Sequence, residues 1–126
     1  GNAWILGPTW DNQDQVKSSE RAIVITERLI PTELIRRDPG RTTIPGFRVS
    51  HVVHLPFAAH PSSVYHVYDF DADHIDLYAR ASKTPEGFQE YLDKYVYGAK
   101  DHWEYLELIG GMKHLNNLIA DPLLGY

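Results

Sequence analysis

The stretch Arg41–His66, RTTIPGFRVSHVVHLPFAAHPSSVYH, decides the fold class of this 126-residue chain. Within it, a Pro-Gly turn precedes the run Arg48–Leu55, whose valine and leucine content predicts a buried strand that ends at Pro56. The loop that follows, up to Tyr65, is rich in Ala, His, Pro and Ser. In open parallel α/β sheets, ligands collect beyond the carboxyl ends of the strands. This loop is therefore the best local candidate for a site.

A second apolar run lies upstream. The segment Arg21–Glu27 carries an Ile-Val-Ile sequence, which suits a strand covered on both faces, as in a parallel sheet. We predict a helix at Asn12–Ser19 before this strand and a short helical turn opened by Pro31 after it. Two or three central strands are too few for a stable open sheet. We therefore expect the remaining strands to come from upstream sequence or from another chain.

Downstream of the loop the pattern becomes helical. Asp73 is the expected N-cap of a helix that ends near Ala81, and Thr84-Pro85 is a typical start of the next helix. Gly98 is expected to end that helix, and Gly110-Gly111 separates two further ones.

These patterns predict an α/β fold: part of an open, mainly parallel sheet, followed by a helical C-terminal tail. We expect residues 1–126 to form a single region, with a strand-rich part at 1–70 and the helical tail at 71–126.

The composition is that of an ordinary globular protein, with 43% hydrophobic residues and no apolar run of bilayer length. Acidic residues outnumber basic ones, 17 to 12. The densest basic group, Arg36, Arg37 and Arg41, is interrupted by Asp38. We therefore expect neither a membrane-spanning segment nor a nucleic-acid partner.

Cysteine is absent, which excludes disulfides, thiolate metal sites and a cysteine nucleophile in this chain. A reducing, cytoplasmic location fits this composition. The chain starts at Gly1-Asn2 without an initiating Met and leads directly into apolar residues. We therefore expect it to be a piece cut from a larger protein.

The acidic run from Asp69 to Asp73 suggests a metal loop at first sight. A calcium EF-hand loop needs Gly at its sixth position and Glu at its twelfth, where this chain has His74 and Arg80. We therefore interpret the run as a loop that leads to a helix cap.

The histidines also give no metal pattern. His51 and His54 are three residues apart, so in a strand their side chains point to opposite faces. His60 and His66 flank a loop that contains proline and could approach each other. Without cysteine, zinc would need these imidazoles plus carboxylates. We predict no bound metal.

A nucleophile is equally hard to find. Ser62 and Ser63 lie near His60, but a proline intervenes and no acid is placed nearby, so a turn is the simpler interpretation. The aromatic residues offer two interpretations that stay open: they line an acyl or pantetheine pocket, or they pack an interface with the missing part. These aromatics are Trp4, Trp10, Phe57 and Tyr65.

Five segments resemble, in the same order, the alpha subunit of family I CoA-transferases of the glutaconate type. They are Gly1-Asn2, AIVITERLIP at Ala22–Pro31, TIPGFRVSHVV at Thr43–Val53, PFAAHPSSVY at Pro56–Tyr65, and YVYGAKDHWEYLELIG at Tyr95–Gly110. The chain departs from the family pattern at Ser50, where many members have Asp, and at Ala58, where the glutaconate branch has Gly. The resemblance is to the C-terminal portion of the subunit.

The resemblance implies that CoA moves between an acyl-CoA and a free carboxylic acid, with a CoA thioester as substrate and no bound cofactor. A Glu of the beta subunit would attack the thioester and carry a glutamyl-CoA intermediate. We therefore expect no catalytic residue in this chain. The implied partners are the rest of the alpha subunit and the beta subunit.

Substrate binding is expected at the loop, at the strand end and at the Gly-Asn segment. The expected residues are Asn2, Glu27, Phe57, His60, Ser62 and Tyr65. Two alternatives stay open. One is a hydrolase of the same fold that cleaves a thioester or carbon–carbon bond of a CoA ester with water. The other is a binding or scaffold module without activity.

Overall fold

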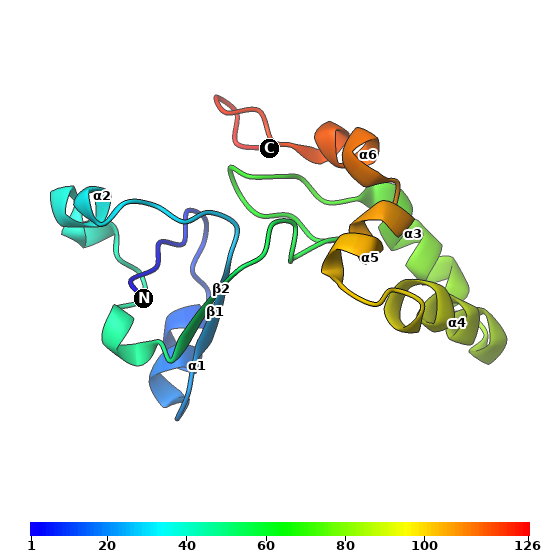
Figure 1. Cartoon of the computed structure of the whole chain (residues 1–126), viewed down its shortest axis with the longest axis horizontal. Coiled ribbons are helices and arrows are strands. Elements are labelled where there is room, and N and C mark those ends of the chain that lie inside the picture. Colours follow the sequence, from blue (N-terminus) through cyan, green and yellow to red (C-terminus); the bar gives the residue numbers. More distant parts are fainter. The chain divides into compact units, whose positions relative to one another are not determined.

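The computed structural model describes all 126 residues of the chain. They form two compact units, Gly1–Ala58 and Ala59–Tyr126, which we call the N-terminal unit and the C-terminal unit. Figure 1 shows the helices and strands in chain order. The prediction that residues 1–126 belong to a single region stays a prediction.

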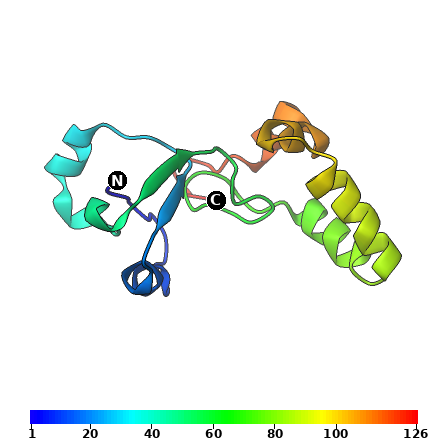
Figure 2. The ribbon, with the colours of Figure 1, turned by 60° about the horizontal axis from the view of Figure 1, so that its bottom comes forward.

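The N-terminal unit contains the two predicted strands. They are β1, Ile23–Thr26, and β2, His51–His54. They lie side by side and pair in parallel, from Ile23 opposite His51 to Thr26 opposite His54 (Figure 2). The predicted parallel α/β arrangement is therefore confirmed.

Short helices complete the N-terminal unit. The predicted helices are confirmed as α1, Asn12–Ser18, and α2, Thr32–Arg37, which begins directly after Pro31. Two single 3₁₀ turns, Pro39–Arg41 and Gly46–Arg48, lie between α2 and β2.

The sheet of the N-terminal unit is exposed within this chain. Ile23 keeps 65% and Ile25 57% of their surface, and Val52 and Val53 are also exposed. The sequence predicted buried strands, and this is wrong for the chain by itself, because no layer of it covers the sheet. Apolar side chains that alternate on both faces of an uncovered sheet fit the expectation that further strands come from elsewhere.

The C-terminal unit is helical, as predicted. It contains α3, Ala72–Ala81, α4, Pro85–Leu92, α5, His102–Leu108, and α6, Gly111–Leu118. Helix α3 packs along α4, and α5 contacts α6 (Figures 1 and 2). None of the helices in the structure combines the length and apolarity required to cross a bilayer.

The helix caps explain where these helices begin. The Thr84 hydroxyl accepts a hydrogen bond from the amide of Gly87, so the predicted start of α4 is confirmed. The predicted cap of α3, Asp73, is wrong by two residues. Asp73 is already helical, whereas Asp71 has extended backbone and its carboxylate accepts the amide of His74 at 2.9 Å. An N-cap needs this non-helical conformation, with the side chain turned back to the third helical amide.

Helix α4 continues into a single π-helical turn, Asp93–Tyr97, which ends at Gly98 as predicted. A Cβ atom built at Gly98 would lie 2.6 Å from the carbonyl oxygen of Asp93 and 2.7 Å from that of Lys94. The π turn is thus closed at a position where only hydrogen fits.

The core of the C-terminal unit forms around Tyr68, which is 1% exposed. Its backbone bridges Val64 on one side and Ile119 on the other. Its hydroxyl oxygen accepts the amide of Ala59 at 2.9 Å. Leu106 and Leu115 are the other large buried side chains. The loop before α3 is thereby fixed against the last two helices of the unit.

Candidate functional site

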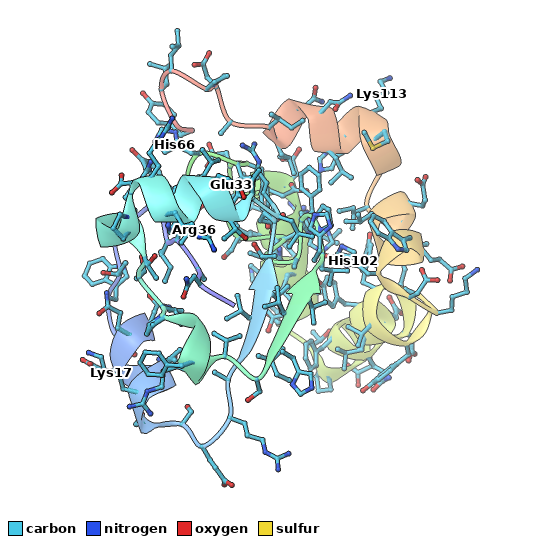
Figure 3. All side chains as sticks on the ribbon, turned by 60° about the vertical axis from the view of Figure 1, so that its left-hand side comes forward. Lys17, Glu33, Arg36, His66, His102 and Lys113 are labelled. Carbon is cyan, nitrogen blue, oxygen red and sulfur yellow. The ribbon has the colours of Figure 1, made fainter.

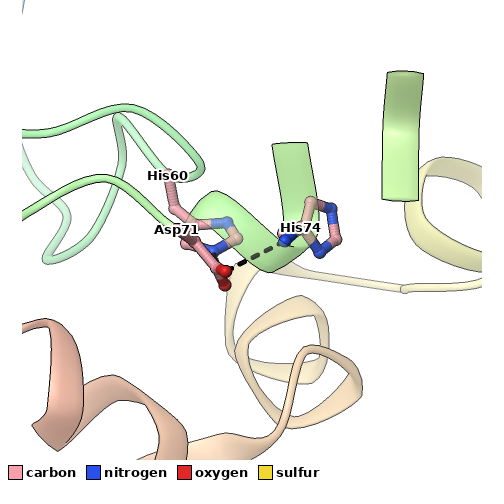
Figure 4. Close-up of side chains that lie close together, drawn as sticks. All are labelled: His60, Asp71 and His74. Carbon is pink, nitrogen blue, oxygen red and sulfur yellow. Dashed lines mark hydrogen bonds and ion pairs between the residues drawn. The ribbon is translucent and has the colours of Figure 1, made fainter. Parts of the chain in front are cut away.

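A buried polar cluster lies at the start of α3 in the C-terminal unit, and Asp71 is its centre. Oδ1 of Asp71 caps α3 by accepting the amide of His74 (Figure 4). Oδ2 lies 3.0 Å from Nε2 of His60 and 2.5 Å from Nε2 of His114. The side chains of His60 and Asp71 are 1% and 3% exposed. One carboxylate therefore joins the loop, α3 and α6.

Two tyrosines extend the cluster. Nδ1 of His60 lies 2.6 Å from the hydroxyl of Tyr105, and Nε2 of His74 lies 2.9 Å from that of Tyr91. The rings of His74 and Tyr95 also meet edge to face, with centroids 4.9 Å apart. A buried polar group without a hydrogen-bond partner destabilises the fold. In this network the imidazoles of His60 and His74 and the hydroxyls of Tyr105 and Tyr91 all have partners.

Charges in the cluster follow from its hydrogen bonds. Burial opposes ionisation of Asp71, but hydrogen bonds from His114, His60 and the His74 amide outweigh it and lower the pKa of Asp71 to about 2. Asp71 is thus an acceptor, so Nε2 of His60 donates to it, and the Tyr105 hydroxyl is the partner of Nδ1.

The other groups are kept neutral. Burial and the neighbouring His60 lower the pKa of His74. Burial also raises the pKa of the Tyr91 hydroxyl and that of the Tyr105 hydroxyl. A raised pKa makes Tyr105 a poor nucleophile, so the sequence of contacts from Tyr105 through His60 to Asp71 is not arranged for covalent catalysis.

A second arrangement lies at the carboxyl end of β1 in the N-terminal unit. The carboxylate of Glu27 accepts the amide of Phe57 at 2.6 Å and that of Ala58 at 3.2 Å. Phe57 has a φ of 58°, a left-handed conformation that costs energy in a residue other than glycine. Two consecutive amides around an anion form a nest, and here the anion is the side chain of Glu27.

The predicted substrate-binding residues of the N-terminal unit are Asn2, Glu27 and Phe57. The side-chain oxygen of Asn2 accepts the amide of Gly46 at 2.6 Å, so Asn2 holds the Pro-Gly turn. Glu27 and Phe57 lie together, because the carboxylate of one fixes the backbone of the other. Their role in substrate binding stays a prediction.

The predicted residues of the C-terminal unit are His60, Ser62 and Tyr65. His60 belongs to the buried cluster. Ser62 is exposed and its amide donates to the carbonyl of Ala59, as the turn interpretation requires. Tyr65 is 48% exposed and its ring contacts His66. The structure does not bring Ser62 or Tyr65 into the cluster.

Sequence reasoning missed five members of the cluster: Asp71, His74, Tyr91, Tyr105 and His114. The sequence placed Asp71 only in a loop before a helix cap. The three-residue spacing from Asp71 to His74 is a local signal, since it places the carboxylate at the amide of His74. Tyr105 and His114 reach the cluster through the packing of α5 and α6, and no local pattern in the sequence indicates this.

Two further histidines have aromatic neighbours of their own. His66 and His102 are among the labelled side chains of Figure 3, and their rings contact those of Tyr65 and Trp103. The predicted approach of His60 to His66 is not observed, because His60 turns to Asp71 while His66 packs against Tyr65. The other labelled side chains are Lys17, Glu33, Arg36 and Lys113.

Comparison with known proteins finds relatives that include two A-subunits of CoA-transferases. The chain is 40% identical over all 126 residues to the A-subunit of glutaconate CoA-transferase from Acidaminococcus fermentans, and covers 39% of that protein. It is 47% identical over 118 residues to an uncharacterized protein of Archaeoglobus fulgidus, covering 94% of this chain and 26% of the relative. It is 24% identical over 105 residues to the A-subunit of 3-oxoadipate CoA-transferase from Pseudomonas knackmussii, covering 83% of this chain and 36% of the relative.

The fold agrees with these sequences. The crystal structure of glutaconate coenzyme A-transferase from Acidaminococcus fermentans matches the whole chain with a TM-score of 0.93, and the chain covers 39% of the matched one. No protein-family model matches the chain. The chain spans well under half the length of the curated relatives it matches. The resemblance expected from the sequence is confirmed: over its whole length the chain is similar, in sequence and in fold, to the A-subunit of glutaconate CoA-transferase.

Proposed function

We propose that the chain is part of the alpha subunit of a heteromeric CoA-transferase and forms the C-terminal portion of that subunit. The observation that carries this proposal is the 40% identity over the full chain, together with the TM-score of 0.93, to a single enzyme of this class. The reaction moves CoA from an acyl-CoA to a carboxylic acid, with a dicarboxylic acid as one candidate. The CoA thioester is the substrate, and no further cofactor is needed.

The nucleophile comes from a partner chain, the beta subunit. In the proposed reaction its Glu carboxylate attacks the thioester carbonyl and releases CoA as a thiolate, which then attacks the resulting anhydride. The products are a glutamyl-CoA thioester and the free acid of the acyl group. The second carboxylic acid then takes the CoA by the reverse sequence, so all bonds balance.

Two carboxylates of this chain, Glu27 and Asp71, are engaged within the protein, which supports a nucleophile on the partner chain. Glu27 lies next to the predicted binding loop, but its two oxygens accept the amides of Phe57 and Ala58. Asp71 is buried and accepts three hydrogen bonds. A carboxylate that stabilises protein amides or imidazoles in this way is poorly placed to attack an acyl carbon.

The proposed role of this chain is to shape the substrate site and to dock its partners. The substrate-binding residues proposed are Asn2, Glu27, Phe57, His60, Ser62 and Tyr65. The exposed apolar faces of β1 and β2 are the proposed contact for the rest of the alpha subunit, because uncovered two-sided strands are unstable in water. We place the assembly in the cytoplasm, in keeping with a chain that lacks cysteine.

Covalent trapping tests this function. The complete assembly is incubated with an acyl-CoA and reduced with borohydride, and the modified peptide is located by mass spectrometry. We expect the reduced Glu on the beta subunit, and we expect Glu27→Gln to leave the adduct in place. An adduct on Glu27 would refute the proposed division of labour. Consumption of the CoA ester with water and no adduct would indicate a hydrolase. No turnover would indicate a scaffold.

A further inference from the structure

Three potential metal ligands converge inside the C-terminal unit, one from the loop and two from the start of α3, and a fourth from α6 lies against one of them. One ligand atom from each of His60, Asp71 and His74 lies within 4.8 Å of the others. Nε2 of His114 lies 2.5 Å from the same Asp71 oxygen that faces His60. In a tetrahedral zinc site with bonds of about 2.0 Å, ligand atoms are about 3.3 Å apart. The 4.8 Å limit for His60, Asp71 and His74 is wider than this, so these side chains would have to draw together around an ion.

The two oxygens of Asp71 have separate tasks. Oδ1 caps α3 through the His74 amide, whereas Oδ2 receives both imidazoles, of His60 and of His114. An ion that replaced these two hydrogen bonds would bind Oδ2 and both Nε2 atoms without removing the cap. The helix that presents His74 would keep its start.

The tyrosines supply the outer contacts that metal-bound imidazoles usually have. When Nε2 of His60 binds an ion, its proton moves to Nδ1 and donates to the Tyr105 oxygen, so the same contact is used in reverse. Nε2 of His74 is held by the Tyr91 hydroxyl, which makes Nδ1 the ligand atom. Such partners fix the tautomer and the ring orientation.

We propose that the C-terminal unit binds one Zn²⁺ ion through His60, Asp71, His74 and His114. Three imidazoles and one carboxylate suit zinc, whereas Ca²⁺ and Mg²⁺ prefer oxygen ligands. Four protein ligands leave no open position, so the ion is structural. The sequence predicted no metal because the acidic run from Asp69 to Asp73 fails the calcium pattern and the histidine spacing is poor. The structure gathers a different set of residues.

Metal binding to the full chain tests this proposal. The chain is stripped with a chelator and titrated with ZnCl₂, while bound zinc is counted and the helical circular dichroism is recorded. We expect one ion per chain, a tetrahedral absorption spectrum with Co²⁺, and a helical signal or unfolding midpoint that rises until one equivalent is bound. Absence of stoichiometric binding, or a Co²⁺ spectrum of octahedral type, would overturn the proposal.

Matched variants locate the ion. His114 is half-buried, so His114→Gln removes a ligand with little disturbance of packing, and it should weaken zinc affinity by about 100-fold or more. His51→Gln removes an exposed histidine and should leave the affinity unchanged. If His114→Gln loses helical signal without zinc, Tyr105→Phe replaces it and should cost about 10-fold. Equal zinc affinity in the variants and the unchanged chain would show binding elsewhere and refute the site.

Discussion

The two units of the chain differ in what they bury. In the C-terminal unit, Tyr68, Leu106 and Leu115 form a core, and the polar groups around Asp71 are paired. In the N-terminal unit, the apolar strands face solvent, and the buried apolar residues are Ala22 and Ile44. The C-terminal unit thus has an interior of its own, although it too exposes large apolar side chains such as Trp103 and Met112, whereas the N-terminal unit leaves the apolar residues of its sheet exposed. The buried core is therefore not divided evenly between the two units.

Removal of the Asp71 carboxylate should cause the largest loss of stability in the C-terminal unit. In Asp71→Ala, the ring N–H groups of His60 and His114 and the amide of His74 all lose their acceptor inside the protein. A buried donor left without an acceptor costs about 1–3 kcal/mol, and this substitution strands more than one. Urea unfolding in chelator, followed by near-ultraviolet circular dichroism of the tyrosines, measures this loss.

Asp76→Ala is the control, because Asp76 is an exposed residue of the same helix. Its free energy of unfolding should stay within about 0.5 kcal/mol of the unchanged chain. Equal destabilisation by the two substitutions would mean that the cluster contributes nothing beyond an ordinary helix position.

Amide hydrogen exchange of the isolated chain should show a difference in local stability between the two units. We expect the amides of Tyr68 and Ala120, bonded to Val64 and Val67, to exchange about 100-fold more slowly than those of β2, since the uncovered sheet opens readily. Equal protection in both units, with one sharp unfolding transition of several kcal/mol, would show that the chain is a complete domain.

Acid should remove the stabilisation that the ionised Asp71 carboxylate gives to the C-terminal unit. The pKa of Asp71 falls from 3.8 to about 2 in the folded state, so its ionisation stabilises folding fully above the unfolded pKa. This contribution, about 2 kcal/mol, is lost as the pH falls from about 5 through the folded pKa. Unfolding of the metal-free chain measured between pH 6 and pH 2 tests it, with Asp71→Asn as comparison. If Asp71→Asn and the unchanged chain lose stability in parallel, another carboxylate is responsible.

The smallest effect is expected in the N-terminal unit. Glu27→Gln leaves one good acceptor for two amides, so the backbone at Phe57 and Ala58 should loosen by about 1 kcal/mol. In the complete assembly this should speed exchange of those two amides about fivefold and leave the C-terminal unit unchanged. Glu20→Gln, at an exposed position, should have no effect. Unaltered exchange at Phe57 would mean that the nest holds without the carboxylate.

Most of the fold could be predicted because its signals are local. The β-branched runs gave both strands, and the caps and glycines gave the start of α4 and the end at Gly98. The error at Asp73 has a physical reason: the aspartates at alternate positions from Asp69 to Asp73 all satisfy the cap preference, and only the backbone conformation selects Asp71. Strand burial could not be judged, because an apolar β-branched run favours a strand whether or not another layer covers it.

The site was less predictable, because it depends on contacts distant in sequence. The loop selected from the sequence contains His60, one member of the cluster, but the sequence assigned its partner Asp71 only to a loop. His114 is 43 positions from Asp71, and the packing of α6 alone brings it there. Glu27 could be selected for its place at a strand end. Its contact with the following loop could be seen only once β1 and β2 were paired.

Gly98 has a consequence for anyone who would engineer this protein. Its φ of −76° is open to every L-amino acid, so a search for stabilising Gly→Ala changes based on backbone angles would select it. Such changes usually gain about 0.4–1 kcal/mol at compatible angles. Here the two carbonyl oxygens that close the π turn occupy the volume a methyl group needs. A saturation library at this position should return glycine, for reasons of space and not of flexibility.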